Sequence, residues 1–331
     1  MINLGSMLET LHYFKALADA TRLRLLLVLR RHELNVNELV ELLGMGQSRV
    51  SRHLKILSSA GLLAPRRDGL WVFYSTVDAG PGRVFIEAIY PFLAAGEGAR
   101  DDLALAAGIV EERAGHTRRF FNRIAEDWDA MSSRLLGAFD LPRAVEEHLP
   151  FPCRVAVDLG CGTGNVLERL LARSDEVIGV DGSARMLELA RRRFSEEAGR
   201  LSLRIGDLEH LPLRDAEADF ICLNLVLHHL SDPQAALREI RRVLRPGGVF
   251  LLSEFDRHED ESLRRDYGDR WLGFDLSMLT RFLRQAGFDG VSSFACPVEK
   301  NLVINLVRAM SQSRPEPLSA GPGRRSKEYM S

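Results

Sequence analysis

The stretch "VAVDLGCGTGNVLERL", residues Val155–Leu170, combines a short apolar run, an acidic residue and a loop with glycine at every second position. The run Val155–Asp158 is typical of a buried strand, and the residues from Asn165 onward have helical periodicity. Glycine lets a backbone approach a ligand closely because it has no side chain in the way. The sequence therefore predicts a strand–loop–helix unit that holds a small polar ligand.

The spacing of the glycines indicates which ligand the loop accepts. A dinucleotide-binding loop would have a third glycine at position 165, where this chain has Asn165. The glycines are instead Gly160, Gly162 and Gly164, and Asp158 precedes them. A carboxylate there would repel a pyrophosphate but not a ligand with an ammonium group and no phosphate. S-adenosylmethionine (SAM) is such a ligand.

The strands that follow end in residues that suit the rest of SAM or of S-adenosylhomocysteine. Asp181 lies 23 residues after Asp158 and can accept hydrogen bonds from ribose hydroxyls. Asp207 can accept from an adenine amino group, with Leu208 against the ring face. The predicted cofactor-binding residues are Asp158, Gly160, Gly162, Gly164, Asp181, Gly182, Asp207, Leu208 and Asn224.

Composition limits the classes of protein that fit. The chain has 331 residues, enough for two domains, and 46% hydrophobic residues. Its net charge of -2 says little about partners, so nucleic-acid binding has to be judged from the local distribution of charge. The four cysteines are scattered without metal-binding spacing, which fits a reducing compartment and predicts no metal site. Without a leader or a long apolar run, we expect a cytoplasmic protein and no membrane partner.

A second pattern lies near the N-terminus, in "LNVNELVELLGMGQSRVSRHLKILSSAGLL" at residues 34–63. Two amphipathic helices flank a turn at Gly44–Gly46, as in a helix-turn-helix motif. The apolar inner faces are formed by Leu39, Leu42, Leu43, Val50, Leu54 and Leu57. The outer face of the second helix holds donors that suit a DNA major groove, namely Gln47, Ser48, Arg49, Ser51, Arg52 and Lys55.

The next stretch, "LLAPRRDGLWVFYSTV", predicts a β-hairpin with its turn at Asp68-Gly69. Arg66 and Arg67 would lie at the tip, where a wing contacts the DNA backbone. From Gly44 to Thr76 there are five basic residues and one acidic residue, a local charge that favours an operator in double-stranded DNA as partner. A helix-turn-helix that contacts only protein is the alternative.

The stretches "LADATRLRLLLVL", "SRVSRHLKILSSAGLL" and "RRDGLWVFYS" resemble the ArsR winged helix-turn-helix regulators, over roughly residues 8–95. The resemblance implies a homodimer formed by the helices around Leu8–Leu17 and Val84–Leu93. Many metal-sensing members carry paired cysteines where this chain has Asn35 and Asn37. Amides are poor ligands for soft metals, so we expect no metal sensing there.

The stretches "VDLGCGTG", "VIGVDGS", "GDLEHLPL" and "VLRPGGVFLLSE" together resemble the class I SAM-dependent methyltransferases, over roughly residues 117–310. "RRFFNRIAEDWDAM" is similar to the segment before the first strand in methyltransferases of the ubiquinone-biosynthesis type. That similarity implies a cofactor contact by Phe120 or Trp128. A core aromatic stripe on a helix is the alternative.

These patterns predict two domains: an N-terminal winged helix-turn-helix, mainly α with a β-hairpin wing, and a C-terminal α/β Rossmann-like methyltransferase fold. The expected divisions are residues 1–98 for DNA binding and dimerisation, 99–116 as a helical linker, 117–310 as the methyltransferase-like domain and 311–331 as a disordered tail. Leu103–Ala130 has helical periodicity, with weak breaks at Gly108 and Gly115, and predicts one linker helix or two.

Two functions fit this organisation. The favoured one is a transcription regulator whose methyltransferase fold binds SAM or S-adenosylhomocysteine as effector, with Leu103–Ala130 coupling the sites. The alternative is an active methyltransferase of a small molecule with an autoregulatory DNA-binding domain. The catalytic residue and the methyl acceptor stay unknown, although several polar residues could lie near strand ends. They are His228, His229, Glu254, Asp256 and Tyr267.

Overall fold

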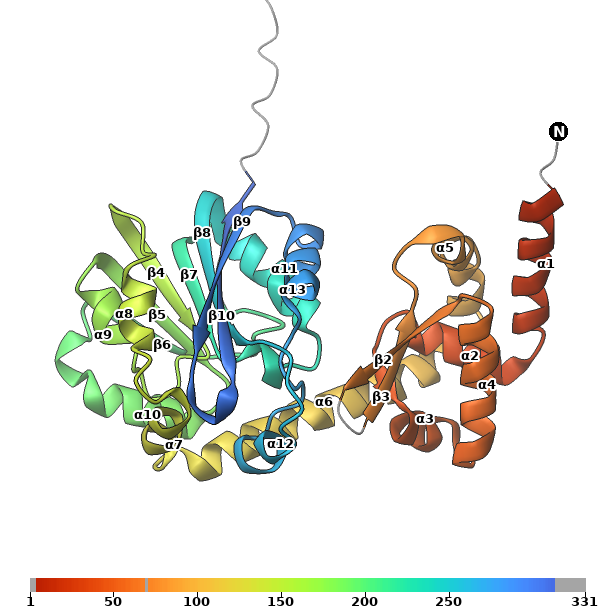
Figure 1. The fold of residues 1–331 in the computed structure, drawn as a ribbon, viewed down its shortest axis with the longest axis horizontal. Helices are drawn as coiled ribbons and strands as arrows, with labels where there is room; N and C mark the ends of the chain where they lie inside the picture. The colour runs from red at the N-terminus through yellow and green to blue at the C-terminus, as the bar shows by residue number, and fades with distance from the viewer. Residues whose placement is uncertain (1–3, 69–70, 313–331) are drawn as a thin grey trace, which may run out of the picture.

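The computed structural model describes residues 4–68 and 71–312 and has two domains connected by one long helix, α6 (Figure 1). The N-terminal domain is helical with a small sheet, and the C-terminal domain is an α/β fold around a larger sheet. The two-domain fold class expected from the sequence is therefore confirmed. Among the described residues, no helix has the length and apolarity needed to cross a membrane.

Five helices and a three-stranded sheet form the N-terminal domain. The helices are α1 (Leu4–Leu17), α2 (Ala20–Leu29), α3 (Val36–Leu43), α4 (Gln47–Ser59) and α5 (Gly80–Ala94), and the strands are β1 (Leu34–Asn35), β2 (Leu63–Asp68) and β3 (Trp71–Thr76). The turn between α3 and α4 begins at Gly44, whose φ of +62° favours glycine. The predicted inner faces of α3 and α4 are buried in the core of this domain.

The start of α3 explains what Asn35 does in this chain. Its side-chain oxygen accepts hydrogen bonds from the backbone N–H groups of Asn37 (2.9 Å) and Glu38 (3.2 Å). The Glu38 carboxylate in turn accepts from the Asn35 backbone N–H at 2.8 Å. These reciprocal bonds form a capping box, which stabilises the helix terminus.

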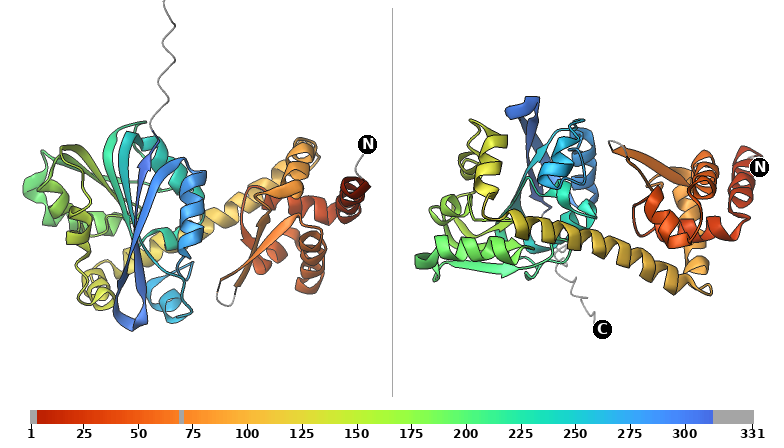
Figure 2. Two further views of the ribbon diagram at one scale, coloured as in Figure 1. Left: turned by 45° about the horizontal axis from the view of Figure 1, so that its top comes forward. Right: turned by 90° about the horizontal axis from the view of Figure 1, so that it is seen from below.

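The wing is a β-hairpin, as its sequence predicted. Strands β2 and β3 pair antiparallel from Leu63 opposite Thr76 to Asp68 opposite Trp71. Gly69, half of the predicted turn, lies outside the described residues. The hairpin extends from the N-terminal domain toward the C-terminal domain (Figure 2).

Helix α6 (Ala99–Ile124) is one continuous helix of 26 residues. The breaks expected at Gly108 and Gly115 do not occur, because both positions remain inside the helix. The expected domain boundary at residue 117 also falls within it. At its beginning, buried Asp102 accepts two hydrogen bonds of 2.7 Å from Arg24 of α2, which fixes α6 to the N-terminal domain.

A seven-stranded sheet in the order β6-β5-β4-β7-β8-β10-β9 forms the centre of the C-terminal domain. The first five strands in this order are parallel, and β10 pairs antiparallel with both β8 and β9. The strands are β4 (Cys153–Leu159), β5 (Ser174–Asp181), β6 (Leu201–Ile205), β7 (Ala218–Asn224), β8 (Leu244–Phe255), β9 (Phe288–Pro297) and β10 (Val303–Ser311). Ser311, expected to start the disordered tail, is thus the last residue of β10.

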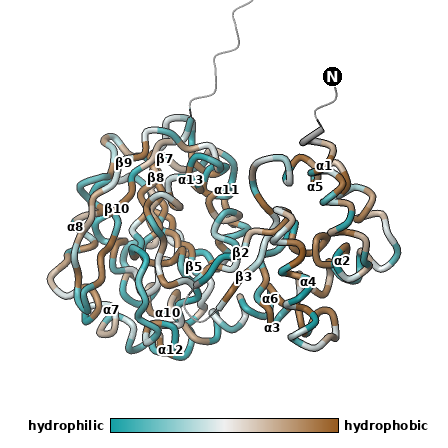
Figure 3. The backbone as a smooth tube through the Cα atoms, turned by 45° about the vertical axis from the view of Figure 1, so that its right-hand side comes forward, coloured by the Kyte–Doolittle hydropathy of each residue, from teal (hydrophilic) through white to brown (hydrophobic). Residues whose placement is uncertain are grey.

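Helices cover both faces of this sheet, as expected for a parallel α/β domain. One face carries α8 (Leu141–Glu146), α9 (Leu167–Leu171) and α10 (Ala184–Arg193), and the other carries α11 (Pro233–Val243) and α13 (Leu276–Gln285). Two further helices, α7 (Trp128–Leu136) and α12 (Ser262–Tyr267), lie near α6 at one end of the sheet (Figure 1). The central strands β7 and β8 are strongly hydrophobic, in keeping with a core on both faces (Figure 3).

Candidate functional site

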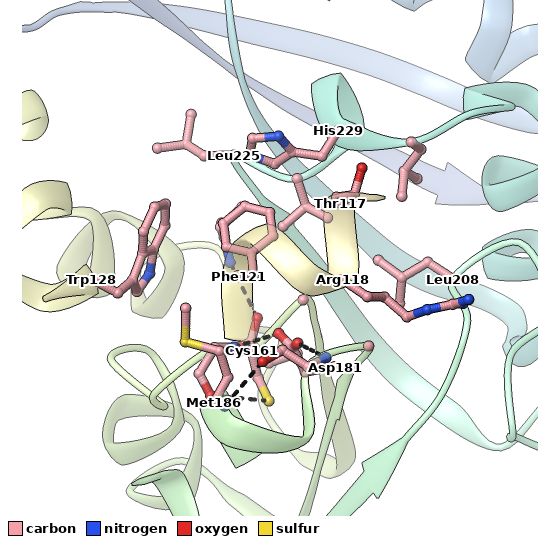
Figure 4. A pocket seen from close by; sticks show the side chains of 18 of the residues that line it. Thr117, Arg118, Phe121, Trp128, Cys161, Asp181, Met186, Leu208, Leu225 and His229 are labelled. Carbon is pink, nitrogen blue, oxygen red and sulfur yellow. Dashed lines mark hydrogen bonds between the residues drawn. The ribbon is translucent and has the colours of Figure 1, made fainter. Parts of the chain in front are cut away.

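A pocket lies at the carboxyl ends of β4, β5 and β7, where the strand order of the sheet reverses. This is where open α/β sheets hold their ligands. The structure brings eight of the nine predicted cofactor-binding residues together around it: Asp158, Gly160, Gly162, Asp181, Gly182, Asp207, Leu208 and Asn224. Helix α6 covers the opening with Thr117, Arg118 and Phe121 (Figure 4).

The ninth residue, Gly164, does not line the pocket. A Cβ atom built on Gly164 would lie 2.6 Å from the ring of Phe194, so this glycine serves the packing of the loop against the domain. Gly160 has a similar constraint, because a Cβ atom there would lie 2.4 Å from the Val226 side chain. Both have positive φ angles, of 92° and 66°, which favour glycine.

Asp181 connects the two loops that bound the pocket. One carboxylate oxygen accepts a hydrogen bond from the Gly162 backbone N–H at 2.9 Å, and the other accepts from the Ser183 N–H at 2.7 Å. Burial raises the pKa of Asp181, and the two backbone bonds act against that rise. The carboxylate is therefore a preorganised acceptor whose remaining lone pairs are available for ligand hydroxyls.

Asp158 lies at the bottom of the pocket and is only 2% exposed. Its Oδ1 atom accepts hydrogen bonds from the Asn224 amide and the Cys222 thiol, both at 3.4 Å. Burial raises the pKa of Asp158 to about 7. A ligand ammonium group would favour its ionised form, so the charge of Asp158 and ligand binding are coupled.

Several pocket residues come from α6 and α7, and Trp128 of α7 is the one of the two aromatic residues suggested by the sequence that lines the pocket. Phe121 and Trp128 both line the pocket with their rings 5.4 Å apart in an edge-to-face arrangement. Phe120, which the sequence suggested as a contact, packs on Gly268 instead. Thr117 and Phe121 are four residues apart on one helix face, and this spacing is the sequence signal that identifies them.

A buried polar network lies beside the pocket. The Glu254 carboxylate is 2.6 Å from His228 Nδ1, and the Asp269 carboxylate is 3.5 Å from His228 Nε2. Burial alone would lower the pKa of His228, but the charges of Glu254 and Asp269 outweigh it and raise the pKa to about 9. His228 is therefore an imidazolium ion held between two carboxylates at neutral pH.

The pKa of His229 is shifted in the opposite direction from that of His228. Of the five polar candidates, His229 is the one that lines the pocket. Burial and the positive charge of His228 hold the pKa of His229 well below its usual value. Its Nδ1 atom lies 3.2 Å from the Gly268 carbonyl, which requires the proton on Nδ1. Nε2 of His229 is then an unprotonated acceptor.

The other three polar candidates, Glu254, Asp256 and Tyr267, make structural contacts within the domain. Glu254 is fully buried against His228, while Asp256 accepts a hydrogen bond from the Asn305 amide at 3.1 Å. The Tyr267 hydroxyl donates to the Met131 carbonyl at 3.4 Å. None of these three lines the pocket.

The predicted DNA-binding residues of α4 form a continuous exposed face. It consists of Gln47, Ser48, Arg49, Ser51, Arg52 and Lys55, all of them exposed. Within residues 4–68 and 71–312, the structure gives the Arg49, Arg52 and Lys55 side chains no ion pair or hydrogen bond. Their charges are available for a partner, and DNA contact stays a prediction.

Arg66 lies near the wing tip, as expected, and its side chain contacts both domains. Its guanidinium donates two hydrogen bonds of 2.9 Å to Glu33 and lies over the ring of Trp271, 3.5 Å from its centre. In addition, Arg257 donates to the Arg67 carbonyl at 2.9 Å. Sequence reasoning missed this position because Trp271 and Arg257 belong to the other domain, so in this arrangement the wing is docked on the C-terminal domain.

Comparison with known proteins agrees with both halves of this description. Residues 157–252 match the family model "Methyltransferase domain", and residues 19–64 match "Bacterial regulatory protein, arsR family". The ubiquinone/menaquinone biosynthesis C-methyltransferase UbiE of Caulobacter vibrioides is 35% identical over 180 residues, which cover 50% of this chain and 68% of that protein. The chain belongs to the SAM-dependent methyltransferase family.

This methyltransferase-family chain also resembles a protein in transposon TN4556 of Streptomyces fradiae, with 43% identity over 121 residues. That match covers 36% of this chain and 34% of that protein, so it describes only part of each. Among solved structures, the [4+2]-cyclase SpnF superposes with a TM-score of 0.52 and 18% identity, over 60% of this chain and 95% of SpnF. This likeness concerns the fold alone.

Proposed function

We propose that this protein is a transcription regulator whose affinity for operator DNA depends on SAM or S-adenosylhomocysteine in the pocket. The observation that carries the proposal is the continuity of α6. Arg113 of α6 forms an ion pair with Glu38 at 2.5 Å and donates to the Glu33 carbonyl at 3.0 Å, both in the DNA-binding domain. One helical turn later, Thr117 lines the pocket.

A ligand in the pocket would contact a helix that is anchored in the DNA-binding domain. Asp102 and Arg113 hold α6 to α2 and α3, and Asn122, further along, accepts hydrogen bonds from Ser183 Oγ (2.7 Å) and the Arg185 N–H (3.2 Å) at the pocket. A rigid helix cannot shift at one end without shifting at the other. Ligand binding and operator binding are coupled to the extent that the ligand prefers one position of α6.

The docked wing supplies a second connection. The Trp271 backbone N–H donates to the His228 carbonyl, and its indole N–H donates to the Leu230 carbonyl, both at 3.0 Å. His229 and Leu230 line the pocket. Arg66 of the wing therefore packs on the Trp271 side chain, and Trp271 is hydrogen-bonded to the segment that forms the pocket wall. A shift of that wall would change the position of the wing.

The proposed regulator acts as a homodimer through α1 and α5. Their outward faces carry large apolar side chains that are 48% to 79% exposed: Leu8, Leu11, Phe14, Val84 and Phe92. Apolar side chains gathered in this way indicate an interaction surface. A second copy would bury both helices and place two α4 helices for the two half-sites of an operator.

The test is a titration of operator DNA at fixed salt with no ligand, saturating SAM or saturating S-adenosylhomocysteine. We expect S-adenosylhomocysteine to change operator affinity by about 5- to 150-fold, and SAM by a different factor. Operator DNA should change the affinity for each ligand by the same factor, since coupling is reciprocal. Three superimposable curves would reject the proposal.

His229 favours a second candidate function, methyl transfer to a small molecule. His229 lines the pocket, and its Nε2 atom is unprotonated. It can therefore act as a base that accepts a proton from a methyl acceptor. Because the relative UbiE is by name a C-methyltransferase of ubiquinone and menaquinone biosynthesis, precursors of these quinones are the first acceptors to test. The test measures the formation of S-adenosylhomocysteine from SAM with and without an acceptor. Product that forms only with an acceptor would establish methyl transfer. If no acceptor of a panel gave product, the regulator would remain as the one supported function.

A further inference from the structure

A second cavity, of about 230 Å³, lies between the two domains and is separate from the ligand pocket. Of the residues that the structure describes, Leu230 and Ser231 alone line both. The charged residues of its wall are four arginines and two glutamates: Glu33, Glu38, Arg66, Arg113, Arg264 and Arg270. The wall therefore has an excess of positive charge, unlike the pocket with its Asp158 and Asp181 carboxylates.

Three of the four arginines have carboxylate partners. Arg66 pairs with Glu33 at 2.9 Å, Arg113 with Glu38 at 2.5 Å, and Arg264 with Glu261 at 3.1 Å. Arg270 differs, because among residues 4–68 and 71–312 no carboxylate forms an ion pair with it. Its Nε atom is buried and makes no hydrogen bond within the same residues. One guanidinium on the wall thus has no carboxylate of the described residues within ion-pair distance, and Glu38 and Glu209 act on it only from farther away.

The position of Arg270 is fixed by its backbone. The N–H groups of Arg270 and Trp271 both donate to the His228 carbonyl at 3.0 Å. Burial lowers the pKa of Arg270 to about 10, and the nearby positive charge of Arg113 adds to this effect. A buried cation in such surroundings costs free energy unless an anion compensates it.

Ser231 provides an independent second observation on the same wall. Its hydroxyl oxygen is buried, and no described residue forms a hydrogen bond with it. On this wall the Arg270 Nε atom and the Ser231 hydroxyl thus make no hydrogen bond with the described residues, and neither belongs to an ion pair. Buried donors in folded proteins are nearly always satisfied, so a group with acceptor atoms is expected between them.

We propose that this cavity binds a small anion through a phosphate or carboxylate group, with Arg270 and Ser231 as its donors. The excess of arginines on its wall favours an anion as the ligand. Arg66 and Arg113 reach the cavity from the DNA-binding side and Arg270 from the methyltransferase side. The anion is thus a counter-ion shared by both domains.

Thermal unfolding of the full chain tests this site with three anions at matched ionic strength: inorganic phosphate, acetate and chloride. Phosphate or acetate should raise Tm relative to chloride, because a ligand that binds only the folded state stabilises it. Arg270→Met should abolish the rise. Arg284→Met, which removes an exposed arginine of α13, should leave it unchanged.

The pattern of responses identifies the anion. A response to phosphate alone assigns a phosphoryl ligand, a response to acetate alone assigns a carboxylate, and both responses assign a site for either group. No response to either anion, or a full response in Arg270→Met, would overturn the proposal.

Calorimetry with the responding anion covers the case in which Arg270→Met fails to fold. Ser231→Ala should weaken binding by removing one hydrogen bond to the anion, and Arg270→Lys, which keeps the charge, should retain part of the affinity. The loss of one charge-assisted hydrogen bond corresponds to about 10- to 100-fold in Kd. Wild-type affinity in both Ser231→Ala and Arg270→Lys would reject the assigned donors.

Discussion

The Arg66 guanidinium of the wing lies 3.5 Å from the ring centre of Trp271 in the other domain. Arginine is the more frequent cation in cation–π contacts, and the indole ring is the best acceptor. Because the Arg66 side chain also pairs with Glu33, it is held between its own domain and the methyltransferase fold. A DNA contact by Arg66 stays a prediction.

Trp271→Ala should reduce the ligand-dependent change in operator affinity, because the wing loses its contact with the pocket wall. A cation–π contact of this kind contributes about 0.5–2 kcal/mol, so the ratio of affinities with and without ligand should fall severalfold toward one. Operator titrations with and without S-adenosylhomocysteine measure this ratio. Trp271→Phe keeps a ring for Arg66 but loses the indole bond to the Leu230 carbonyl, so it should reduce the ratio less than Trp271→Ala does. An unchanged ratio in Trp271→Ala would mean that coupling does not pass through the wing.

Arg52→Ala should weaken operator binding, since Arg52 is an exposed donor on the outer face of α4. The loss of one phosphate contact should lower the salt slope by about one unit, whereas the loss of a bidentate base contact should cost about 1–3 kcal/mol and relax sequence preference. Arg143→Ala, at an exposed position of α8, is the control with the same charge change. Equal affinity and salt slope for the two variants would remove Arg52 from the interface.

The parts of the site that the sequence predicted are those set by local rules. Strand ends and glycine spacing predicted eight of the pocket residues, because the carboxyl ends of parallel strands lie at one edge of the sheet. The choice of Phe121 over Phe120 depends on how α6 is rotated, which its anchors at Asp102 and Arg113 determine. Those anchors join residues far apart in the chain, and no local pattern encodes them.

The position of Arg66 shows the same limit for the wing. A basic hairpin tip predicts a DNA contact as long as the hairpin is considered alone. The docked position depends on Trp271, which is some two hundred residues away in the sequence. The interdomain cavity and the burial of Arg270 on its wall depend on the same packing of the two domains.

Asp181→Asn should lower the affinity for SAM and for S-adenosylhomocysteine together. Asp181 accepts the Gly162 and Ser183 N–H groups with its two oxygens, and an amide nitrogen cannot replace either acceptor. Losing a charged acceptor costs about 1.5–3 kcal/mol, or roughly 10- to 100-fold in Kd for both ligands. Calorimetry on folded protein measures this.

Asp219→Asn is the matched control for that experiment. Asp219 also accepts two backbone N–H groups, from Arg154 and Val155, but it does not line the pocket. It should lower stability without changing ligand affinity. Wild-type affinity of Asp181→Asn for either ligand would show that Asp181 is not the ribose acceptor.

The affinity for S-adenosylhomocysteine should increase as pH rises through about 7, because burial raises the pKa of Asp158 to about 7. Below that pH the carboxyl group is neutral and cannot attract the ligand's ammonium group, and above it the carboxylate can. Each pH unit below the pKa then costs up to about tenfold in affinity. Calorimetry between pH 5.5 and 8.5 at constant ionic strength gives the profile.

Asp158→Asn separates this effect from other titrations near the pocket. Asp269 has its pKa raised to about 6 by burial, but it does not line the pocket, and its contribution should remain in the variant. The variant should bind more weakly at pH 8 and lose the increase centred near 7. If the wild type and Asp158→Asn gave parallel pH profiles, the carboxylate at the bottom of the pocket would not be the group that meets the ligand's ammonium.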